Sequence, residues 1–346
     1  MSRLKNITQF GQQIWLDNLT RGLLEQGELE RWIAEDGIAG VTSNPAIFYQ
    51  AIRDDLGYQT DLPDIKAVLS SPEERFEALV LPDIRCACDM LRPLYEASRG
   101  NAGFVSFEIS PRLAHDAEGT IEAARRVWSE INRPNAMIKI PATPAGLEAV
   151  FESIAAGINV NVTLIFGPAQ LAAAQAAHRR GLEARAARGA SVAGIASVAS
   201  VFISRIDTLL DAQLPPELRG KAAIASARVA YARWRALPPL LEGAMSQKLL
   251  WASTSSKNPD YRDVLYVESL IGPETINTVP DATLEAFRDH GEAAETLTEA
   301  PEESLRILDA CTRAIGRDLD QVGEQLLDAG LRQLNEAFDK LLKLVM

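Results

Sequence analysis

The sequence has few of the two residue types that build most zinc sites and disulfide frameworks. It contains three histidines and three cysteines among 346 residues. The histidines stand far apart and form no H-x-x-x-H pair, so a zinc site is disfavoured and no metal is expected. The cysteines, Cys86, Cys88 and Cys311, are odd in number and fit no disulfide framework. This usage predicts a reducing, cytoplasmic environment.

The chain also has no long apolar run and no excess of basic charge. No stretch approaches the roughly 18 apolar residues of a membrane span, and the N-terminus lacks the apolar run of a signal peptide. Its 35 basic and 47 acidic residues give a net charge of −12. This charge argues against nucleic acid or an anionic membrane as the main partner. A few local basic groups could still hold one phosphorylated metabolite.

Eight short apolar runs alternate with amphipathic stretches. The runs are rich in Val and Ile, which is typical of β-strands. Eight β–α units in a row predict an α/β protein, a (β/α)8 TIM barrel. An open doubly wound sheet is the alternative, and the lack of Gly-x-Gly-x-x-Gly counts against its dinucleotide-binding version. The predicted strands are Gln13–Asp17, Gly40–Thr42, Phe104–Glu108, Ala136–Ile140, Ile158–Ile165, Ala196–Phe202, Lys248–Trp251 and Thr275–Val279.

Extra helices are expected at the N-terminus, in an insertion and at the C-terminus. We expect residues 1–291 to form the barrel, with two or three helices inserted at about 49–103, a stretch too long for one loop. Residues 292–346 should form a helical extension packed on the barrel. In the last helix, apolar residues recur every three to five positions from Val322 to Val345. This pattern favours a helix on the barrel's outside, with a dimerisation helix as the alternative, so the chain is a monomer or a homodimer.

Alternation along a strand places one lysine inside the barrel. In Ala136–Ile140, Met137 and Lys139 share the face opposite to Ile138 and Ile140. Of eight lysines, only Lys139 lies in the middle of an apolar strand. Burying an ammonium is costly, and a lysine that is neutral near pH 7 can attack a carbonyl to form a Schiff base. The alternative is a lysine that reaches out of the barrel mouth into a salt bridge.

Other polar residues fall near the carboxyl ends of strands, where barrel active sites lie. The alternation rule points Asp17 and Glu108 inward and puts Leu164 on the opposite face to Thr163. One or two such residues could be caps or turn formers, such as Asn44 before Pro45. A purely structural interior would favour Val, Ile and Leu, so the whole set predicts an active site. Its members are Asp17, Asn44, Glu108, Lys139, Asn161, Thr163 and Ser200.

Two loops after neighbouring strands carry hydroxyl and basic groups. Residues 200–205 follow the sixth strand, and residues 251–258 follow the seventh. Hydroxyls, backbone N–H groups and an arginine or lysine suit a phosphate dianion. Such a loop is commonly only a loop, and Arg205 with Asp207 could be a surface ion pair. Because the loops follow adjacent strands, the ligand interpretation is favoured.

Seven motifs occur in a fixed order along the chain. They are Ile14-Trp-Leu-Asp-Asn-Leu, Gly40-Val-Thr-Ser-Asn-Pro, Val105-Ser-Phe-Glu, Met137-Ile-Lys-Ile-Pro-Ala-Thr, Asn159-Val-Asn-Val-Thr-Leu-Ile-Phe, Ser200-Val-Phe-Ile-Ser-Arg-Ile-Asp and Leu250-Trp-Ala-Ser-Thr-Ser-Ser-Lys-Asn-Pro. Each is weak alone, whereas seven in this order are highly specific. Because it carries these motifs, the chain resembles the transaldolase family, specifically its longer form with a C-terminal helical extension. The resemblance covers Gln13 to about Gly291.

The resemblance implies a (β/α)8 barrel that acts on sugar phosphates without a cofactor. Lys139 matches the lysine that forms the Schiff base. Asp17 matches the aspartate that moves protons on substrate hydroxyls during C–C cleavage. Glu108 matches the glutamate that handles protons in carbinolamine dehydration, through a water held with the threonine matching Thr163.

The resemblance also implies the substrate contacts. Asn44 and Asn161 match asparagines that bond the dihydroxyacetone part, and Ser200 lies where the family has a serine near the sugar. Arg205 and Ser253 match phosphate ligands. Shorter family members have a basic phosphate ligand, an arginine, two residues after the serine that matches Ser253. This chain has Ser255 there, so the resemblance assigns the role of the second basic phosphate ligand to Lys257. The implied reaction converts sedoheptulose 7-phosphate and glyceraldehyde 3-phosphate to erythrose 4-phosphate and fructose 6-phosphate, in the non-oxidative pentose phosphate pathway.

Three alternatives remain at the level of sequence. A related lysine aldolase would release free dihydroxyacetone, but members of that kind are much shorter. A silent barrel would bind sugar phosphate without a covalent adduct, and the presence of Asp17, Glu108 and Lys139 speaks against it. A metal-dependent aldolase is disfavoured by the dispersed histidines.

Overall fold

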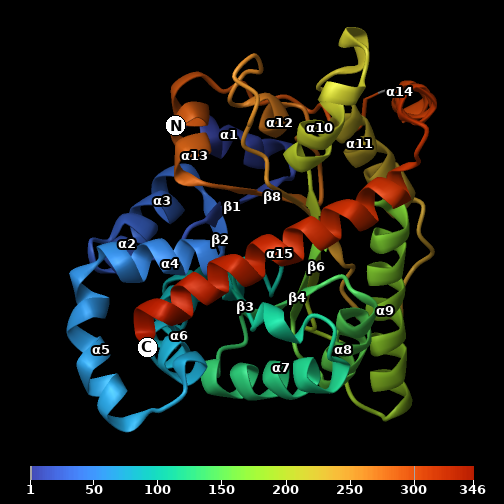
Figure 1. Cartoon of the computed structure of the whole chain (residues 1–346). Coiled ribbons are helices and arrows are strands. Elements are labelled where there is room, and N and C mark those ends of the chain that lie inside the picture. The colour runs from blue at the N-terminus through green and yellow to red at the C-terminus, as the bar shows by residue number, and fades with distance from the viewer. Residues whose placement is uncertain (1, 300) are drawn as a thin grey trace.

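The chain folds into a closed barrel of parallel strands that are joined in sequence order from β1 to β8 (Figure 1). The computed structural model describes residues 2–299 and 301–346. Strand β8 pairs with β1 and closes the sheet, so the predicted TIM barrel is confirmed. The strands are β1 (Gln13–Asp17), β2 (Ile38–Thr42), β3 (Phe104–Glu108), β4 (Ala136–Pro141), β5 (Val160–Ile165), β6 (Ser197–Phe202), β7 (Lys248–Ala252) and β8 (Thr275–Val279).

Helices connect the strands and surround the barrel. Before β1 lie α1 (Arg3–Asn6) and the 3₁₀ helix η1 (Ile7–Phe10). The helices between strands are α2 (Arg21–Glu25), α3 (Glu28–Asp36), α4 (Pro45–Asp54), α5 (Leu56–Val68), α6 (Pro72–Ala97), η2 (Pro111–Leu113), α7 (Ala117–Ile131), α8 (Pro144–Ala156), α9 (Pro168–Ala187), α10 (Ser204–Leu210), η3 (Asp211–Gln213), η4 (Pro216–Leu218), α11 (Ala222–Arg235) and α12 (Leu265–Glu268). After β8 come α13 (Asp281–His290), α14 (Pro301–Ile315) and α15 (Leu319–Val345). The stretch at 49–103 thus contains the end of α4 and all of α5 and α6.

Local sequence signals set where two of these helices begin. The Ser71 hydroxyl accepts a bond from the Glu74 N–H at 3.4 Å and caps α6. The Thr143 hydroxyl accepts from the Gly146 N–H at 2.9 Å and caps α8 directly after β4. Each cap satisfies an N–H group that has no partner within its helix, so each helix begins next to the capping residue.

The barrel interior has an apolar layer, with polar side chains nearer the carboxyl ends of the strands. The apolar layer includes Trp15, Phe104 and Met137. Two residues further along β1 and β4 come Asp17 and Lys139, which line a cavity at those ends. Because successive side chains of a strand alternate between its faces, the inward positions predicted for these strands are confirmed.

The alternation rule fails at one residue of β5. Leu164 has a left-handed backbone conformation with φ of 58°, and the pairing of β5 with β6 shifts register between Val162 and Ile165. This irregularity brings Thr163 and Leu164 to the same cavity, although the sequence predicts opposite faces for them. The physical reason is that an extra residue in one strand breaks the two-residue period locally.

Helix α15 runs across the carboxyl ends of the strands and not along the outer ring of helices (Figure 1). Near its start, Asp320 accepts a bond from the Ala169 N–H of α9 at 2.7 Å. Near its end, the Val345 carbonyl accepts from Arg75 of α6 at 3.1 Å. The expected position on the barrel's outside is therefore wrong, because α4, α6 and α9 provide the surface that the helix packs against.

The apolar stripe of α15 is already covered by this chain. Among the described residues, its members Val322, Leu326, Leu331, Phe338, Leu341 and Val345 are buried in a single copy. A stripe that packs inside its own chain does not offer a free apolar face to a second copy. Whether the protein is a monomer or a homodimer stays a prediction. No helix in the described part of the chain is long and apolar enough to cross a membrane.

One glycine is required for the apolar layer. A Cβ atom placed on Gly40 of β2 would lie 2.5 Å from carbons of the Trp15 ring. We expect Gly40→Ala to lower the free energy of unfolding by about 1–3 kcal/mol, the usual cost of overpacking a core. Urea denaturation of the purified variant measures this change.

The matched control is Gly22→Ala in α2, where an added Cβ meets its nearest neighbour at 3.5 Å, an ordinary contact. That variant should be as stable as the parent or slightly more, because alanine is the better helix former. Equal stability of the two variants would contradict the packing argument.

Candidate active site

A cavity of about 360 Å³ lies at the carboxyl ends of the strands, with α15 forming part of its wall. Pockets of this size hold small molecules, and barrel active sites lie at this end. All ten predicted site residues line it except Asn161. Its lining includes Asp17, Thr42, Asn44, Glu108, Lys139, Thr163, Leu164, Ser200, Phe202, Arg205, Ser253, Ser255, Lys257, Thr278, Gly330, Gln333, Leu334 and Ala337.

Lys139 lies deep in this cavity beside Glu108. Its Nζ is 3.6 Å from Glu108 Oε2 and donates to the Ser43 carbonyl oxygen at 3.2 Å. The parallel register of β3 and β4 sets the two residues side by side. Their side chains are only 9% and 4% exposed, so Lys139 does not reach out of the mouth to a surface partner. Burial raises the pKa of Glu108, and the charge on Lys139 opposes that rise.

A buried hydroxyl without a protein partner lies on the neighbouring strand. Thr163 Oγ1 is buried and bonds no other described residue. Glu108 Oε2 likewise has no partner within hydrogen-bond distance in the described chain. Both side chains line the same cavity. Since buried polar atoms are rarely left without a partner, both atoms are available to a ligand or a water molecule.

Asp17 is oriented by two threonines that the sequence analysis did not select. The Thr42 hydroxyl donates to Asp17 Oδ1 at 2.7 Å. The hydroxyls of Thr42 and Thr278 are also 2.7 Å apart. Because Thr42 uses its single proton on Asp17, Thr278 donates to Thr42. The signal that could have identified both residues is their position near the carboxyl ends of β2 and β8, on the face that points inward.

The two predicted asparagines have different surroundings. Asn44 caps α4 through Oδ1, which accepts from the N–H groups of Ala46 and Ile47, while the residue also lines the cavity. It is therefore both a cap and a site residue, and its amide N–H₂ is not used by that cap. Asn161 is fully buried, accepts from Ser200 at 2.6 Å and donates to Ser106 at 3.1 Å. In this structure Asn161 holds Ser200 in place.

Basic and hydroxyl groups gather at the side of the cavity formed by the loops after β6 and β7. The hydroxyls of Ser204 and Ser253 are 3.1 Å apart. Lys257 is exposed and donates to Ser255 at 2.9 Å. Arg205, Ser253 and Lys257 line this part of the cavity. They supply cationic and hydroxyl donors, which suit an anion.

Arg205 has no carboxylate partner within the described chain, so the surface pair with Asp207 considered from the sequence does not form. Asp207 instead accepts bonds from the Tyr266 hydroxyl and the Ala223 N–H, both at 2.9 Å. Burial raises the pKa of Asp207 to about 7 and lowers that of Arg205. Arg205 thus keeps an unneutralised positive charge at the cavity.

Four residues of α15 complete the wall of the cavity. Gly330, Gln333, Leu334 and Ala337 follow the spacing of one helix face. A Cβ on Gly330 would lie 3.0 Å from Leu164, so glycine lets the helix approach β5 closely. The sequence analysis missed these residues. No local signal marks them, because their neighbours in the cavity are far away in the chain.

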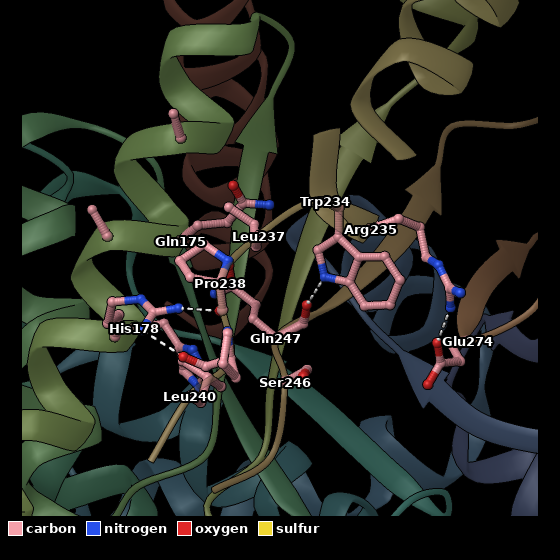
Figure 2. Close-up of a pocket in the computed structure, with 14 residues that line it drawn as sticks. Gln175, His178, Trp234, Arg235, Leu237, Pro238, Leu240, Ser246, Gln247 and Glu274 are labelled. Carbon is pink, nitrogen blue, oxygen red and sulfur yellow. Dashed lines mark hydrogen bonds and ion pairs between the residues drawn. The ribbon is translucent and has the colours of Figure 1, made fainter. Parts of the chain in front are cut away.

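A second cavity of about 430 Å³ lies between α9 and the segment that joins α11 to β7 (Figure 2). Its lining residues Gln247 and Glu274 directly precede β7 and β8, so it lies toward the amino ends of these strands. Trp234 donates to the Gln247 carbonyl there at 2.8 Å. Burial lowers the pKa of His178 to about 4, so its ring is neutral at pH 7. No predicted site residue lines this cavity, and the candidate active site is the one at the carboxyl ends.

The described residues contain no group of three or more His, Cys, Asp or Glu side chains arranged to hold a metal ion. The side chains that line the candidate site include a lysine, carboxylates, hydroxyls and an arginine. A buried lysine can act as a nucleophile toward a carbonyl, and a neighbouring carboxyl group can transfer its protons.

Comparisons with known proteins find relatives that match almost the whole chain. A family model described as transaldolase/fructose-6-phosphate aldolase matches residues 14–345. A transaldolase of Thiobacillus denitrificans is 49% identical over 356 residues, with 99% of each chain covered. A transaldolase of Neisseria gonorrhoeae is 49% identical over 349 residues, also with 99% of each covered. A protein named transaldolase 2 of Nostoc is 42% identical and covers 99% of this chain and 96% of its own.

The electrostatics of the buried pair can be tested by titration. Lys139 lowers the pKa of Glu108 and Asp17 raises it. We therefore expect Lys139→Met to raise the pKa of Glu108 further, and Asp17→Asn, the matched control of opposite sign, to lower it. The ¹³C chemical shift of the Glu108 carboxyl carbon, followed as the pH is varied, gives the pKa of Glu108 in each variant. The Glu108→Gln variant identifies which signal belongs to Glu108. A lower pKa in Lys139→Met would contradict the arrangement of charges.

Proposed function

This chain belongs to the transaldolase/fructose-6-phosphate aldolase family and is a transaldolase, and we propose that it transfers a dihydroxyacetone unit through a Schiff base on Lys139. The donor is sedoheptulose 7-phosphate and the acceptor is glyceraldehyde 3-phosphate. The products are erythrose 4-phosphate and fructose 6-phosphate. The observation that carries the proposal is a buried lysine, 3.6 Å from a buried carboxyl group, at the carboxyl end of the barrel.

The first step forms the covalent bond. Lys139 Nζ attacks the ketose carbonyl carbon and gives a carbinolamine, which loses water to become an iminium. Glu108 supplies the proton that the departing oxygen needs, because burial raises its pKa and favours the protonated form. Thr163 Oγ1, which has no partner within the described chain, can hold the water molecule that carries this proton.

The second step breaks the bond between C3 and C4. Asp17 takes the proton of the C4 hydroxyl, the C3–C4 electrons move into the iminium, and the aldehyde leaves. The bond from Thr42 fixes one oxygen of Asp17 and leaves the other free to act. The three-carbon fragment stays bound to Lys139 as an enamine. The acceptor aldehyde then enters the place that the first aldehyde left. A new C3–C4 bond forms while Asp17 returns its proton to the C4 oxygen. Hydrolysis of the iminium releases the new ketose and frees Lys139, which gives ping-pong kinetics.

Other residues of the cavity hold the substrate. Arg205 supplies the main charge for the phosphate, with Ser253 and Lys257 beside it. Asn44 bonds the dihydroxyacetone part through its free amide N–H₂ group. Ser200, held by Asn161, faces the same part of the sugar.

The proposal extends to the domain organisation, the partners and the cellular location of the protein. Residues 1–291 form the catalytic barrel and residues 292–346 the helical extension. The partners are small sugar phosphates and not nucleic acid or membrane, and the reaction needs no cofactor. We place it in the cytoplasm, in the non-oxidative pentose phosphate pathway. The three cysteines are free, which agrees with a reducing compartment.

The covalent step is tested by trapping. Borohydride treatment with fructose 6-phosphate should leave a reduced three-carbon adduct on Lys139, located by peptide mass mapping. Lys139→Arg keeps the charge but should give neither adduct nor turnover, because a guanidinium is not a nucleophile. An acceptor assay separates a transaldolase from an aldolase that releases free dihydroxyacetone. A folded protein with no adduct on any lysine would overturn the mechanism.

The phosphate role of Arg205 makes a separate prediction. Arg205→Ala should raise the KM for fructose 6-phosphate by about 10- to 100-fold, the range expected for losing a charged hydrogen bond. Phosphate-free fructose should be affected little. Steady-state kinetics on both donors measure the difference, and equal losses on both would place the phosphate elsewhere.

A further inference from the structure

Arg205 is held by a neutral side chain from the far end of the sequence. Its Nη1 donates to the amide oxygen of Gln333 on α15. The two residues are 128 positions apart, and both line the cavity. Arg205 also lies near the ring of Phe202, with its guanidinium carbon 5.9 Å from the ring centre. The direction of the guanidinium is thus set by one amide and one aromatic ring.

The helix that carries Gln333 is fixed on both sides of the cavity. Asp320 joins it to α9, and the carbonyl of Val345 joins it to α6. Gln333 lies between these two attachments, on the helix face that also presents Gly330 and Ala337 to the cavity. Although its side chain is exposed at the mouth, its backbone is anchored. The amide therefore offers Arg205 a fixed acceptor.

We propose that Gln333 is a positioning residue for substrate recognition, which orients Arg205 without cancelling its charge. This inference rests on the proposed role of Arg205 in phosphate binding. A carboxylate at this position would accept the same bond but would also neutralise the guanidinium and repel a phosphate dianion. An amide oxygen accepts the bond and carries no net charge. The C-terminal extension thereby contributes directly to selectivity for phosphorylated substrates.

The residue type at position 333 distinguishes this role from a structural one. Gln333→Ala should raise the KM for fructose 6-phosphate about threefold to tenfold with kcat unchanged, as expected for loss of one exposed hydrogen bond. Gln333→Glu should raise that KM more than Gln333→Ala does. If Gln333 served only to attach α15, the glutamate variant would behave like the parent, because glutamate accepts the same bond.

The chain offers a matched control on the same helix. Gln325 accepts a bond from Arg317 at 2.7 Å on the exposed surface and does not line the cavity. Gln325→Ala removes the same kind of pair from the same helix. It should leave kcat and the KM for fructose 6-phosphate unchanged, which separates loss of orientation at the cavity from a general effect on α15.

The experiment is steady-state kinetics on the full chain with fructose 6-phosphate and phosphate-free fructose, for the parent, the two Gln333 variants, Gln325→Ala, Arg205→Ala and the double variant Arg205→Ala/Gln333→Ala. Because Gln333 acts through Arg205, the double variant should be no worse than Arg205→Ala alone. The KM for phosphate-free fructose should change much less than the KM for fructose 6-phosphate in the Gln333 variants.

The outcomes separate this inference from the proposed function. If Arg205→Ala raises the KM for fructose 6-phosphate while both Gln333 variants match the parent, the role of Gln333 is overturned and the phosphate role of Arg205 stands. If Gln333→Glu binds fructose 6-phosphate as tightly as the parent, the charge argument is wrong. If Arg205→Ala itself has no effect, the proposed phosphate site fails, and the inference that rests on it fails too.

Discussion

A lysine and a carboxyl group are buried side by side inside the barrel, next to an apolar layer of side chains. Lys139 and Glu108 are 3.6 Å apart and almost inaccessible to water. Removing charges from water is costly, so each group depends on the other and on bonds such as that from Lys139 to the Ser43 carbonyl. The parallel register of β3 and β4 sets this spacing. The closed sheet thus provides the constraint on which the chemistry of the cavity depends.

The polar groups around that pair are themselves held by neighbours. Thr42 and Thr278 orient Asp17, and Asn161 fixes Ser200. These bonds come from inward positions of adjacent strands, so the network closes only when the sheet closes. A site supported in this way is preorganised, because each reacting side chain is already directed by a bond or by packing. This is the physical basis for assigning separate proton-transfer roles to Asp17 and Glu108.

The C-terminal helix turns an open barrel end into a walled cavity. It crosses the mouth, packs against the inserted helices and brings Gln333 to Arg205. One end of the cavity holds the buried Lys139 and Glu108, and another part presents Arg205, which no carboxylate neutralises within the described chain. A sugar phosphate has the matching asymmetry, with a carbonyl at one end and a dianion at the other. The extension is in this sense part of the site and not an appendage.

The sequence by itself determined the eight strands, their order and the inward positions of Asp17, Glu108 and Lys139. Strand alternation is a local property, and eight β–α units allow few arrangements. It also identified Arg205, because the residue follows a strand end. Only the tertiary structure decided that Leu164 turns into the cavity, that α15 lies over the mouth, and that Gln333 holds Arg205. These features depend on a register shift and on packing between segments far apart in the chain, and neither leaves a periodic signal in the sequence.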